Sequence, residues 1–461
     1  MGRRTPGGAL LLLLACFYAL FLGGSFYTSD GDVMFHTTES LVRRGTLAVQ
    51  PDPALPQIVA GQNGRWYGKY DPGLPLIAAP FFALGDALAD INHAHRTALA
   101  ALVVLLAPVL AAAGAAAITG VLAGDLFGAR RGIGIALIAG IASPLWPYAR
   151  TLFPEAILAC ALAGAVALAV HAARRGDPRV RDWIAVGAVF GVGMLVRAAF
   201  ATYALPLAIL VLSARAVPDI RAAIRRLAAL GIGVLPFALG LLAHNALRFG
   251  DPFRFGYPGE GFTTPPWEGI AGLLFSPGKS VFLYAPPLIL AAILWPRFRR
   301  AQPALGGFLA AAWIVALAFY GSWWAWGGGW CWGPRFLVPL IPLGLLPLGM
   351  LPAARGWRIA AAALVALGIA AQIVSTRVDV TLYYAVGEAA GVNSNHAWVA
   401  PGDAPLVWAA DELAAGQTEP LALFHLGDLG LPPTWSVGVP LLCAAGIALG
   451  AWRIRMAIRS G

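Results

Sequence analysis

Apolar runs of about 20 residues recur from one end of this chain to the other, and they constrain its fold more than any other feature. A helix of that length crosses the roughly 30 Å hydrocarbon core of a bilayer. Only 12% of the 461 residues are charged, against about 25% in a typical soluble domain. No stretch is long and polar enough to form a separate soluble domain. The sequence therefore predicts one all-α polytopic membrane domain over residues 1–461.

The apolar runs predict about 12 transmembrane helices. We expect them at residues 8–26, 96–124, 131–149, 152–173, 182–200, 201–215, 226–247, 280–296, 304–323, 335–353, 357–376 and 435–453. Two further segments, Val33–Arg44 and Leu74–Leu88, have the amphipathic pattern of helices that lie on a membrane surface.

If the N-terminus is placed in the cytoplasm, most basic residues fall in cytoplasmic loops and most acidic residues fall in loops on the outer side of the membrane. The cytoplasmic loops then carry 20 of the 32 basic residues and four of the 22 acidic ones. The basic residues form the clusters Arg3/Arg4, Arg130/Arg131, Arg174/Arg175/Arg179/Arg181, Arg215/Arg221/Arg225/Arg226, Arg297/Arg299/Arg300, Arg355/Arg358 and Arg453/Arg455/Arg459. Because basic loops stay in the cytoplasm, this pattern predicts that both termini are cytoplasmic. It also explains the net charge of +10 without a nucleic-acid partner.

The segments on the other side are long and rich in acidic and aromatic residues. They are residues 27–95, 248–279 and 377–434, with a shorter aromatic loop at 324–335. Such loops on one face of a bundle favour a binding or catalytic site there. We therefore expect an extracytoplasmic site.

The first outer segment contains the clearest candidates for acid–base chemistry. Asp30 and Asp32 follow the first span directly, and His36 and Glu39 can share one face of the helix that follows. A carboxylate at a membrane surface can act as general base on a sugar hydroxyl. The alternative is that Asp30 only caps this helix, a position that Asp favours.

Basic residues in the outer half indicate an anionic ligand. The chain has 30 Arg and only two Lys, Lys69 and Lys279, and each Lys follows a glycine in an outer segment. A compact ammonium beside free backbone amides suits a phosphate, although two lysines could also fall there by chance. Arg197 lies in an apolar run, where an arginine is either functional or extends to the membrane surface.

Two further motifs each allow two interpretations. Glu155 lies at the start of the fourth predicted span. It is either a functional acid or an acidic residue that the helix dipole favours at this position. Five tryptophans surround three consecutive glycines at residues 323–332. Trp326 and Trp330 in this cluster could bind a sugar or isoprenoid against exposed backbone, or could belong to an interfacial aromatic belt.

In their order and common side, these motifs resemble the GT-C superfamily, in particular the protein O-mannosyltransferases and the aminoarabinose transferases that modify lipid A. Asp30-Gly31-Asp32 stands where those enzymes carry Asp-Glu, so either aspartate can match the catalytic one. Thr151–Ala156 resembles the second acidic motif of these enzymes, and Leu195–Phe200 resembles their Leu-Thr-Arg-Pro segment. Three later segments are similar to motifs of a bacterial branch of the superfamily: Asn245–Tyr257, Leu273–Pro287 and Trp323–Phe336.

The resemblance implies a GT-C fold in the bacterial plasma membrane and an inverting transfer of a sugar from a polyprenyl-phosphate donor. The acceptor would be a glycan, a lipid or a protein. It implies Asp30 or Asp32 as base and Glu155 as an assisting acid, with Lys69, Arg197, Lys279 and Arg335 at the donor phosphate. His36, Tyr70, Tyr257, Tyr284, Trp326 and Trp330 are candidate substrate contacts.

No cofactor is required by the sequence, although the many outer carboxylates could hold a divalent metal ion. The alternative function is a transporter or flippase of a lipid-linked or anionic solute. A transporter would be expected to carry charges near the middle of the membrane and to show inverted repeats, and neither is evident in the sequence.

Overall fold

The architecture comes from a computed structural model, which describes residues 5–175, 179–213, 219–389, 395 and 397–459. Within these ranges the fold is helical, with one small antiparallel sheet. The predicted cytoplasmic residues Arg3, Arg4 and Arg215 lie outside the described residues.

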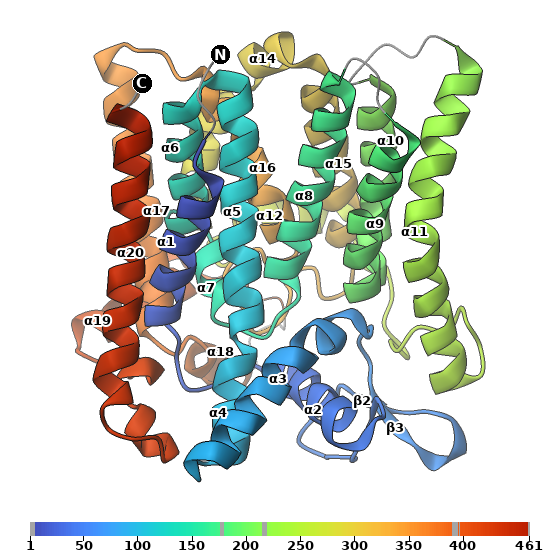
Figure 1. Cartoon of the computed structure of the whole chain (residues 1–461), viewed down its shortest axis with the longest axis vertical. Helices are drawn as coiled ribbons and strands as arrows, with labels where there is room; N and C mark the ends of the chain where they lie inside the picture. The colour runs from blue at the N-terminus through green and yellow to red at the C-terminus, as the bar shows by residue number, and fades with distance from the viewer. Residues whose placement is uncertain (1–4, 176–178, 214–218, 390–394, 396, 460–461) are drawn as a thin grey trace.

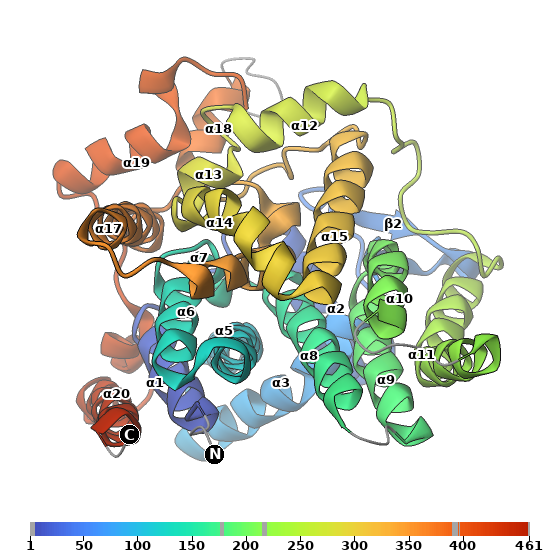
Figure 2. The same cartoon turned by 90° about the horizontal axis from the view of Figure 1, so that it is seen from above.

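The longer helices run side by side between two ends of the molecule, and both termini lie at the same end (Figure 1). The bundle is formed by α1 (Gly7–Leu20), α4 (Arg96–Val104), α5 (Leu106–Phe127), α6 (Ala129–Ile141), α8 (Glu155–Arg174), α9 (Val180–Val196), α10 (Ala204–Ser213), α11 (Ile220–Phe249), α14 (Pro287–Ala301), α15 (Pro303–Gly321), α17 (Arg355–Arg377) and α20 (Trp435–Arg459). In Figure 2 α8 lies between α5 and α9 and packs against both. At one edge, α20 packs against α1.

Seven of the described helical segments are long and apolar enough to cross a membrane. They are Gly73–Asn92, Arg96–Phe127, Glu155–Arg174, Ile220–Phe249, Pro303–Gly321, Arg355–Arg377 and Trp435–Arg459. Three shorter apolar helical stretches are Gly7–Leu20, Ala198–Ser213 and Arg335–Met350. The polytopic all-α membrane fold is therefore confirmed, and the number of 12 spans stays a prediction.

Several predicted spans are interrupted in the structure. The span expected at 131–149 is α6 followed by the short α7 (Leu145–Ala149), and that at 280–296 is α13 (Val281–Tyr284) followed by α14. The span expected at 201–215 begins within the 3-10 helix η2 (Ala198–Tyr203) and continues as α10. The span expected at 335–353 consists of η3 (Arg335–Leu340), α16 (Ile341–Gly344) and η4 (Leu346–Met350). A proline inside each of these three pieces removes an amide donor, which prevents a continuous α-helix.

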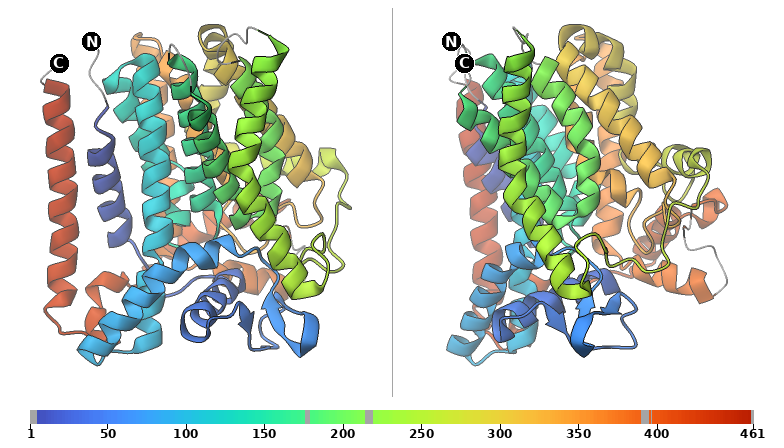
Figure 3. Two further views of the ribbon diagram at one scale, coloured as in Figure 1. Left: turned by 45° about the vertical axis from the view of Figure 1, so that its right-hand side comes forward. Right: turned by 90° about the vertical axis from the view of Figure 1, so that its right-hand side faces the viewer.

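The first outer segment covers the end of the bundle that is opposite to the termini (Figure 3). It contains α2 (Ser29–Arg44) and α3 (Gly73–Asn92), which pack against each other. Both predicted segments are therefore helical, and their location on the membrane surface stays a prediction. Helix α2 starts where the Thr28 hydroxyl accepts a hydrogen bond from the Gly31 amide at 3.3 Å. It ends at Gly45, whose φ of 66° is left-handed and favours glycine.

A small sheet between α2 and α3 is a feature that the sequence analysis did not predict. Its strand order is β1 (Ala48–Val49), β3 (Trp66–Gly68), β2 (Ile58–Ala60), with the turn η1 (Gln62–Gly64) between β2 and β3. Arg248, near the end of α11, donates to the carbonyl oxygens of Gly68 at 2.8 Å and Tyr70 at 2.9 Å. The bundle thus fixes the chain that leaves β3.

The later outer segments carry α12 (Pro266–Phe275), α18 (Thr381–Ala389), α19 (Pro405–Ala414), η5 (Pro401–Asp403), η6 (Ala422–Phe424) and η7 (Leu426–Leu429). The last of these segments folds back toward the start of the chain. Glu419 forms an ion pair of 2.5 Å with the buried Arg150, which also bonds to the Tyr27 hydroxyl. The Ala422 amide donates to the Leu22 carbonyl oxygen at 2.8 Å. Segments from both ends of the sequence are therefore joined at this face.

Candidate active site

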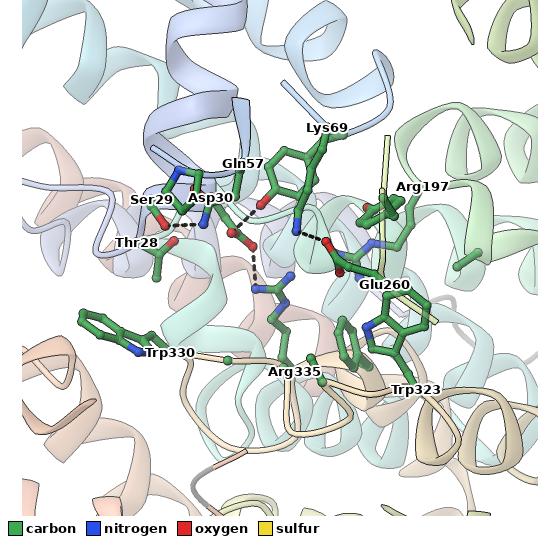
Figure 4. Close-up of a pocket in the computed structure, with 18 of the residues that line it drawn as sticks. Thr28, Ser29, Asp30, Gln57, Lys69, Arg197, Glu260, Trp323, Trp330 and Arg335 are labelled. Atoms are coloured by element: carbon green, nitrogen blue, oxygen red, sulfur yellow. Dashed lines mark hydrogen bonds and ion pairs between the residues drawn. The ribbon is translucent and has the colours of Figure 1, made fainter. Parts of the chain in front are cut away.

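A cavity of about 1500 Å³ lies among the outer segments (Figure 4). Residues from the following segments line it: 25–32, 54–57, 69–71, 197–202, 255–262, 319–330, 335–336 and 379–388. The predicted outer segments therefore converge on one cavity, although the sequence separates them by hundreds of residues.

Asp30 lies on the cavity wall in the first turn of α2. Its Oδ2 atom pairs with Arg335 Nη1 at 2.9 Å, and its Oδ1 atom accepts a hydrogen bond from the Tyr70 hydroxyl. Burial alone would raise the pKa of this carboxyl, but Arg335 and Tyr70 outweigh it and hold the pKa below its ordinary value. Burial and the Asp30 charge raise the pKa of Tyr70 well above its ordinary value, so Tyr70 keeps its proton as the donor. Asp30 is thus an oriented, ionised acceptor for a proton.

Glu155, Arg335 and Arg197 continue this row of charges behind Asp30. Glu155 is fully buried at the start of α8, and its Oε1 atom contacts Arg197 Nη1 at 2.8 Å and Arg335 Nε at 3.2 Å. The rings of Phe153 and Phe336 lie 4.3 Å and 5.2 Å from the Arg335 guanidinium carbon. Two arginines are therefore held rigidly at the cavity with one enclosed counter-ion.

Lys69 forms a second charged group on the cavity wall, next to the Tyr70 that binds Asp30. It follows β3 directly, and its ammonium pairs with Glu260 Oε1 at 2.7 Å. The other carboxylate oxygen, Glu260 Oε2, accepts from the Trp324 indole at 3.0 Å. The ammonium also lies 5.2 Å from the Tyr257 ring centre and 5.7 Å from that of Tyr70. Aromatic rings and one carboxylate thus stabilise the cation at the cavity.

Asp32 also lines the cavity, but in a different environment. Among the residues that the structure describes, no side chain makes a hydrogen bond or ion pair with it. Partial burial raises the pKa of Asp32, and His36 one turn later opposes this shift. Of the two predicted acids, only Asp30 is fixed in direction.

Asp71 is a buried acid in this wall that the sequence analysis did not single out. It follows Tyr70, and its Oδ2 atom accepts from the Ala198 amide at 2.6 Å. This bond joins the first outer segment to η2, next to Arg197. Glu260 was missed in the same way, because a single acid in an aromatic-rich loop matches no motif. Its only local signal is the pair of glycines, Gly259 and Gly261, that flank it.

Lys279 does not line the cavity, contrary to its predicted contact with the donor phosphate. It is 0% exposed, and its ammonium donates to the carbonyl oxygens of Gly329 and Cys331 at 3.0 Å each. Gly328 and Gly329 line the cavity with left-handed φ values of 83° and 71°. Lys279 therefore supports the glycine turn from behind. A Gly-Lys pair that ends a turn looks the same in sequence as one that binds phosphate.

Three of the predicted substrate contacts also lie outside the cavity. Tyr284 packs edge-on against Trp332, with ring centres 4.9 Å apart. Trp326 is buried against α12, where its ring lies over Gly272. His36 is half-exposed on α2 and contacts Glu39 at 3.4 Å. By contrast, Tyr70, Tyr257 and Trp330 line the cavity as predicted.

The outer carboxylates do not gather into a group suited to a metal ion. In the described part of the chain, no three His, Cys, Asp or Glu side chains are placed together to hold one. Two acids of the cavity wall, Asp30 and Glu260, are instead paired with Arg335 and Lys69, and the enclosed Glu155 is paired with Arg197.

Comparison with known proteins adds the following findings. The family model for dolichyl-phosphate-mannose-protein mannosyltransferases matches residues 97–240, less than half of the chain. The comparison with curated proteins found no match. Among solved structures, ArnT from Cupriavidus metallidurans in the apo state matches with a TM-score of 0.53 and 15% identity. This match covers 96% of this chain and 73% of that one.

The structure of the same ArnT bound to undecaprenyl phosphate matches with a TM-score of 0.50 and 18% identity over 98% of this chain and 75% of that one. The chain has the fold of the GT-C superfamily. An oligosaccharyltransferase from Archaeoglobus fulgidus matches at a TM-score of 0.40, with 14% identity over 90% and 56% of the two chains. In this GT-C fold, the part matched by the family model contains Glu155 and Arg197 but neither Asp30 nor Arg335.

Proposed function

We propose that this protein is a membrane glycosyltransferase that moves a sugar from a polyprenyl-phosphate donor to an acceptor hydroxyl. The observation that carries the proposal is an oriented carboxylate, Asp30, on a cavity wall that also holds Arg335, Arg197 and Lys69. The family model names a dolichyl-phosphate sugar donor, and ArnT of similar fold binds undecaprenyl phosphate. Both comparisons support a lipid phosphate as the anionic part of the substrate.

In the proposed reaction, Asp30 is the general base. The acceptor hydroxyl oxygen attacks the anomeric carbon as its proton passes to the Asp30 carboxylate. A new glycosidic bond forms, and the bond from the anomeric carbon to the phosphate oxygen breaks. The polyprenyl phosphate leaves with that electron pair. A single displacement of this kind inverts the anomeric configuration.

The three cations would stabilise the negative charge that develops on the leaving phosphate. Arg335 and Arg197 are preorganised by Glu155, so they need little rearrangement when charge develops. Glu155 would therefore act through these arginines rather than on the sugar. Tyr257 and Trp330 provide rings that would contact the sugar or the acceptor.

The cavity lies at the end of the bundle away from both termini. With the basic loops in the cytoplasm, this end faces outward, and the proposed location is the bacterial plasma membrane. The acceptor would be a glycan, a lipid or a protein that reaches the outer face.

The test compares aspartate variants in isolated membranes that are supplied with radiolabelled polyprenyl-phosphate hexoses and pentoses. Release of polyprenyl phosphate and of labelled product is measured. Asp30→Asn should lower the rate by about 100- to 10,000-fold, the usual contribution of a general base. Asp52→Asn, an exposed acid of the same segment outside the cavity, is the matched control and should keep the wild-type rate.

Asp32→Asn should lower the rate by less than Asp30→Asn, because no described partner orients the Asp32 carboxylate. If Asp32→Asn abolishes transfer and Asp30→Asn does not, the base is Asp32. If the double variant keeps full transfer, the proposed mechanism is wrong. Translocation of intact labelled donor in proteoliposomes, without cleavage of its phosphate bond, would instead establish a flippase.

A further inference from the structure

Each cation of the cavity already has an anionic partner in this structure. Arg335 pairs with Asp30, Arg197 with Glu155 and Lys69 with Glu260. An incoming lipid phosphate therefore finds no uncompensated positive charge among these three side chains. It must either share a cation or replace one of the three carboxylates.

Glu155 is poorly suited to being replaced. It is enclosed at the start of α8, where its Oε1 atom contacts both Arg197 and Arg335. Removing a carboxylate from such a site would leave buried cations uncompensated, which is strongly destabilising. Asp30 is held by Arg335 and by the Tyr70 hydroxyl, and the proposed reaction needs it in place.

Glu260 differs from Glu155 in its exposure and from Asp30 in having no part in the proposed reaction. Its side chain is 18% exposed and that of Lys69 is 19% exposed, so solvent reaches this ion pair. The backbone beside Glu260 is fixed, because the Gly261 carbonyl accepts from the Trp324 amide at 3.0 Å. The carboxylate can therefore leave Lys69 by a side-chain rotation that keeps the segment in place. A partly exposed pair costs less to separate than a buried one.

We infer that Glu260 is a resident counter-ion that competes with the lipid phosphate for Lys69 and promotes release of the polyprenyl-phosphate product. This inference rests on the proposed function. Lys69 would exchange Glu260 for the donor phosphate on binding and return to Glu260 after transfer. The product is a phosphomonoester, which carries more negative charge than the diester of the donor and would otherwise remain bound to Lys69.

The experiment measures binding of undecaprenyl phosphate to the purified full chain in nanodiscs. Glu260→Gln removes the competing charge but keeps an oxygen that can accept from the Trp324 indole. It should bind undecaprenyl phosphate about fivefold more tightly than the wild type, which corresponds to about 1 kcal/mol. Glu268→Gln, an exposed residue of α12 outside the cavity, is the matched control and should bind like the wild type.

A double-mutant cycle separates competition for Lys69 from general repulsion of the phosphate. In a Lys69→Gln background, Glu260→Gln should change the affinity less than about twofold, because the shared cation is gone. In steady-state transfer assays, Glu260→Gln should lower the KM for donor and also lower kcat, since product release slows. Glu260→Asp keeps the charge and should lie between Glu260→Gln and the wild type.

The outcomes distinguish this inference from the function on which it rests. If the wild type binds undecaprenyl phosphate and Glu260→Gln binds it equally or more weakly, competition by Glu260 is disproved and the glycosyltransferase proposal stands. An equal gain in the Lys69→Gln background would likewise exclude competition for Lys69. If the wild type does not bind undecaprenyl phosphate, the lipid-phosphate donor itself is wrong.

Discussion

Asp71 shows how one buried acid can make this fold sensitive to pH. Burial raises the pKa of Asp71 to about 6, although the Ala198 amide, Arg248 and Arg197 oppose the shift. In an unfolded chain the pKa of an aspartate is about 3.9. Between these two values the folded protein binds more protons than the unfolded one. The contribution of Asp71 to stability therefore falls as the pH rises through this window, and it stays low above pH 6.

Asp71→Asn should consequently stabilise the protein at alkaline pH. The amide is neutral, and its oxygen can still accept from the Ala198 amide. We expect Asp71→Asn to gain about 1–3 kcal/mol over the wild type at pH 8 and much less at pH 5, where the wild-type carboxyl is mostly protonated. Thermal unfolding in detergent at the two pH values measures this, with the exposed Asp52→Asn as control. An equal difference at both pH values would contradict the assignment.

At the scale of residues, the sequence identifies side chains that carry chemistry better than it identifies their partners. Asp30 and Arg335 were both candidates, but they are 305 positions apart in the chain, so no local signal predicts their contact. Periodicity and helix propensity act over a few turns, whereas this pairing depends on how the whole bundle packs. Lys279 shows the reverse case, since its local pattern was clear and its position is structural.

Among the helices, the contact between α9 and α11 depends on two glycines. A Cβ atom at Gly233 would overlap the Ile184 carbonyl oxygen of α9, and one at Gly187 would overlap the Leu230 carbonyl oxygen of α11. Small residues let membrane helices approach this closely. Because α11 carries Arg248, the same contact also determines the position of the chain after β3.

Gly233→Val should therefore lower stability by about 1–3 kcal/mol through overpacking and should also reduce sugar transfer. Gly231→Val is the matched control, because no other atom lies within 4 Å of a Cβ added at that position of the same helix. Both substitutions change helix propensity equally. Melting temperatures and transfer rates of the two variants are compared. If both behave alike, the close contact is not what holds α11.

Elements were predicted well where hydrophobicity alone determines them and poorly where proline or a small sheet intervenes. The long apolar runs gave α8, α15 and α17 close to their expected ranges, and the run expected at 96–124 is divided between α4 and α5. The stretch from η3 to η4 was predicted as one helix, because its leucines make the whole segment hydrophobic. Its prolines remove backbone amide donors, so the segment does not form a continuous α-helix. The strands β1 to β3 have two or three residues each, which is too short for a periodic signal.

For the molecule as a whole, the distribution of charge makes a prediction about sidedness. Single cysteines are introduced in a background without the four native ones, at Asp52 near the cavity end and at Arg300 near the end that holds the termini. A membrane-impermeant maleimide should label Asp52→Cys in intact cells and should label Arg300→Cys only after the membranes are opened. The reverse pattern would place the cavity in the cytoplasm.

The row of charges from Asp30 through Arg335 to Glu155 and Arg197 also has a consequence for biosynthesis. The ribosome makes the two acids and Arg197 long before it makes Arg335, the cation that touches both carboxylates. A nascent chain that stops short of Arg335 holds Asp30 without its guanidinium and lacks the turn that completes the cavity wall. A truncated product cannot assemble this network, so the network forms only once the later helices have been inserted.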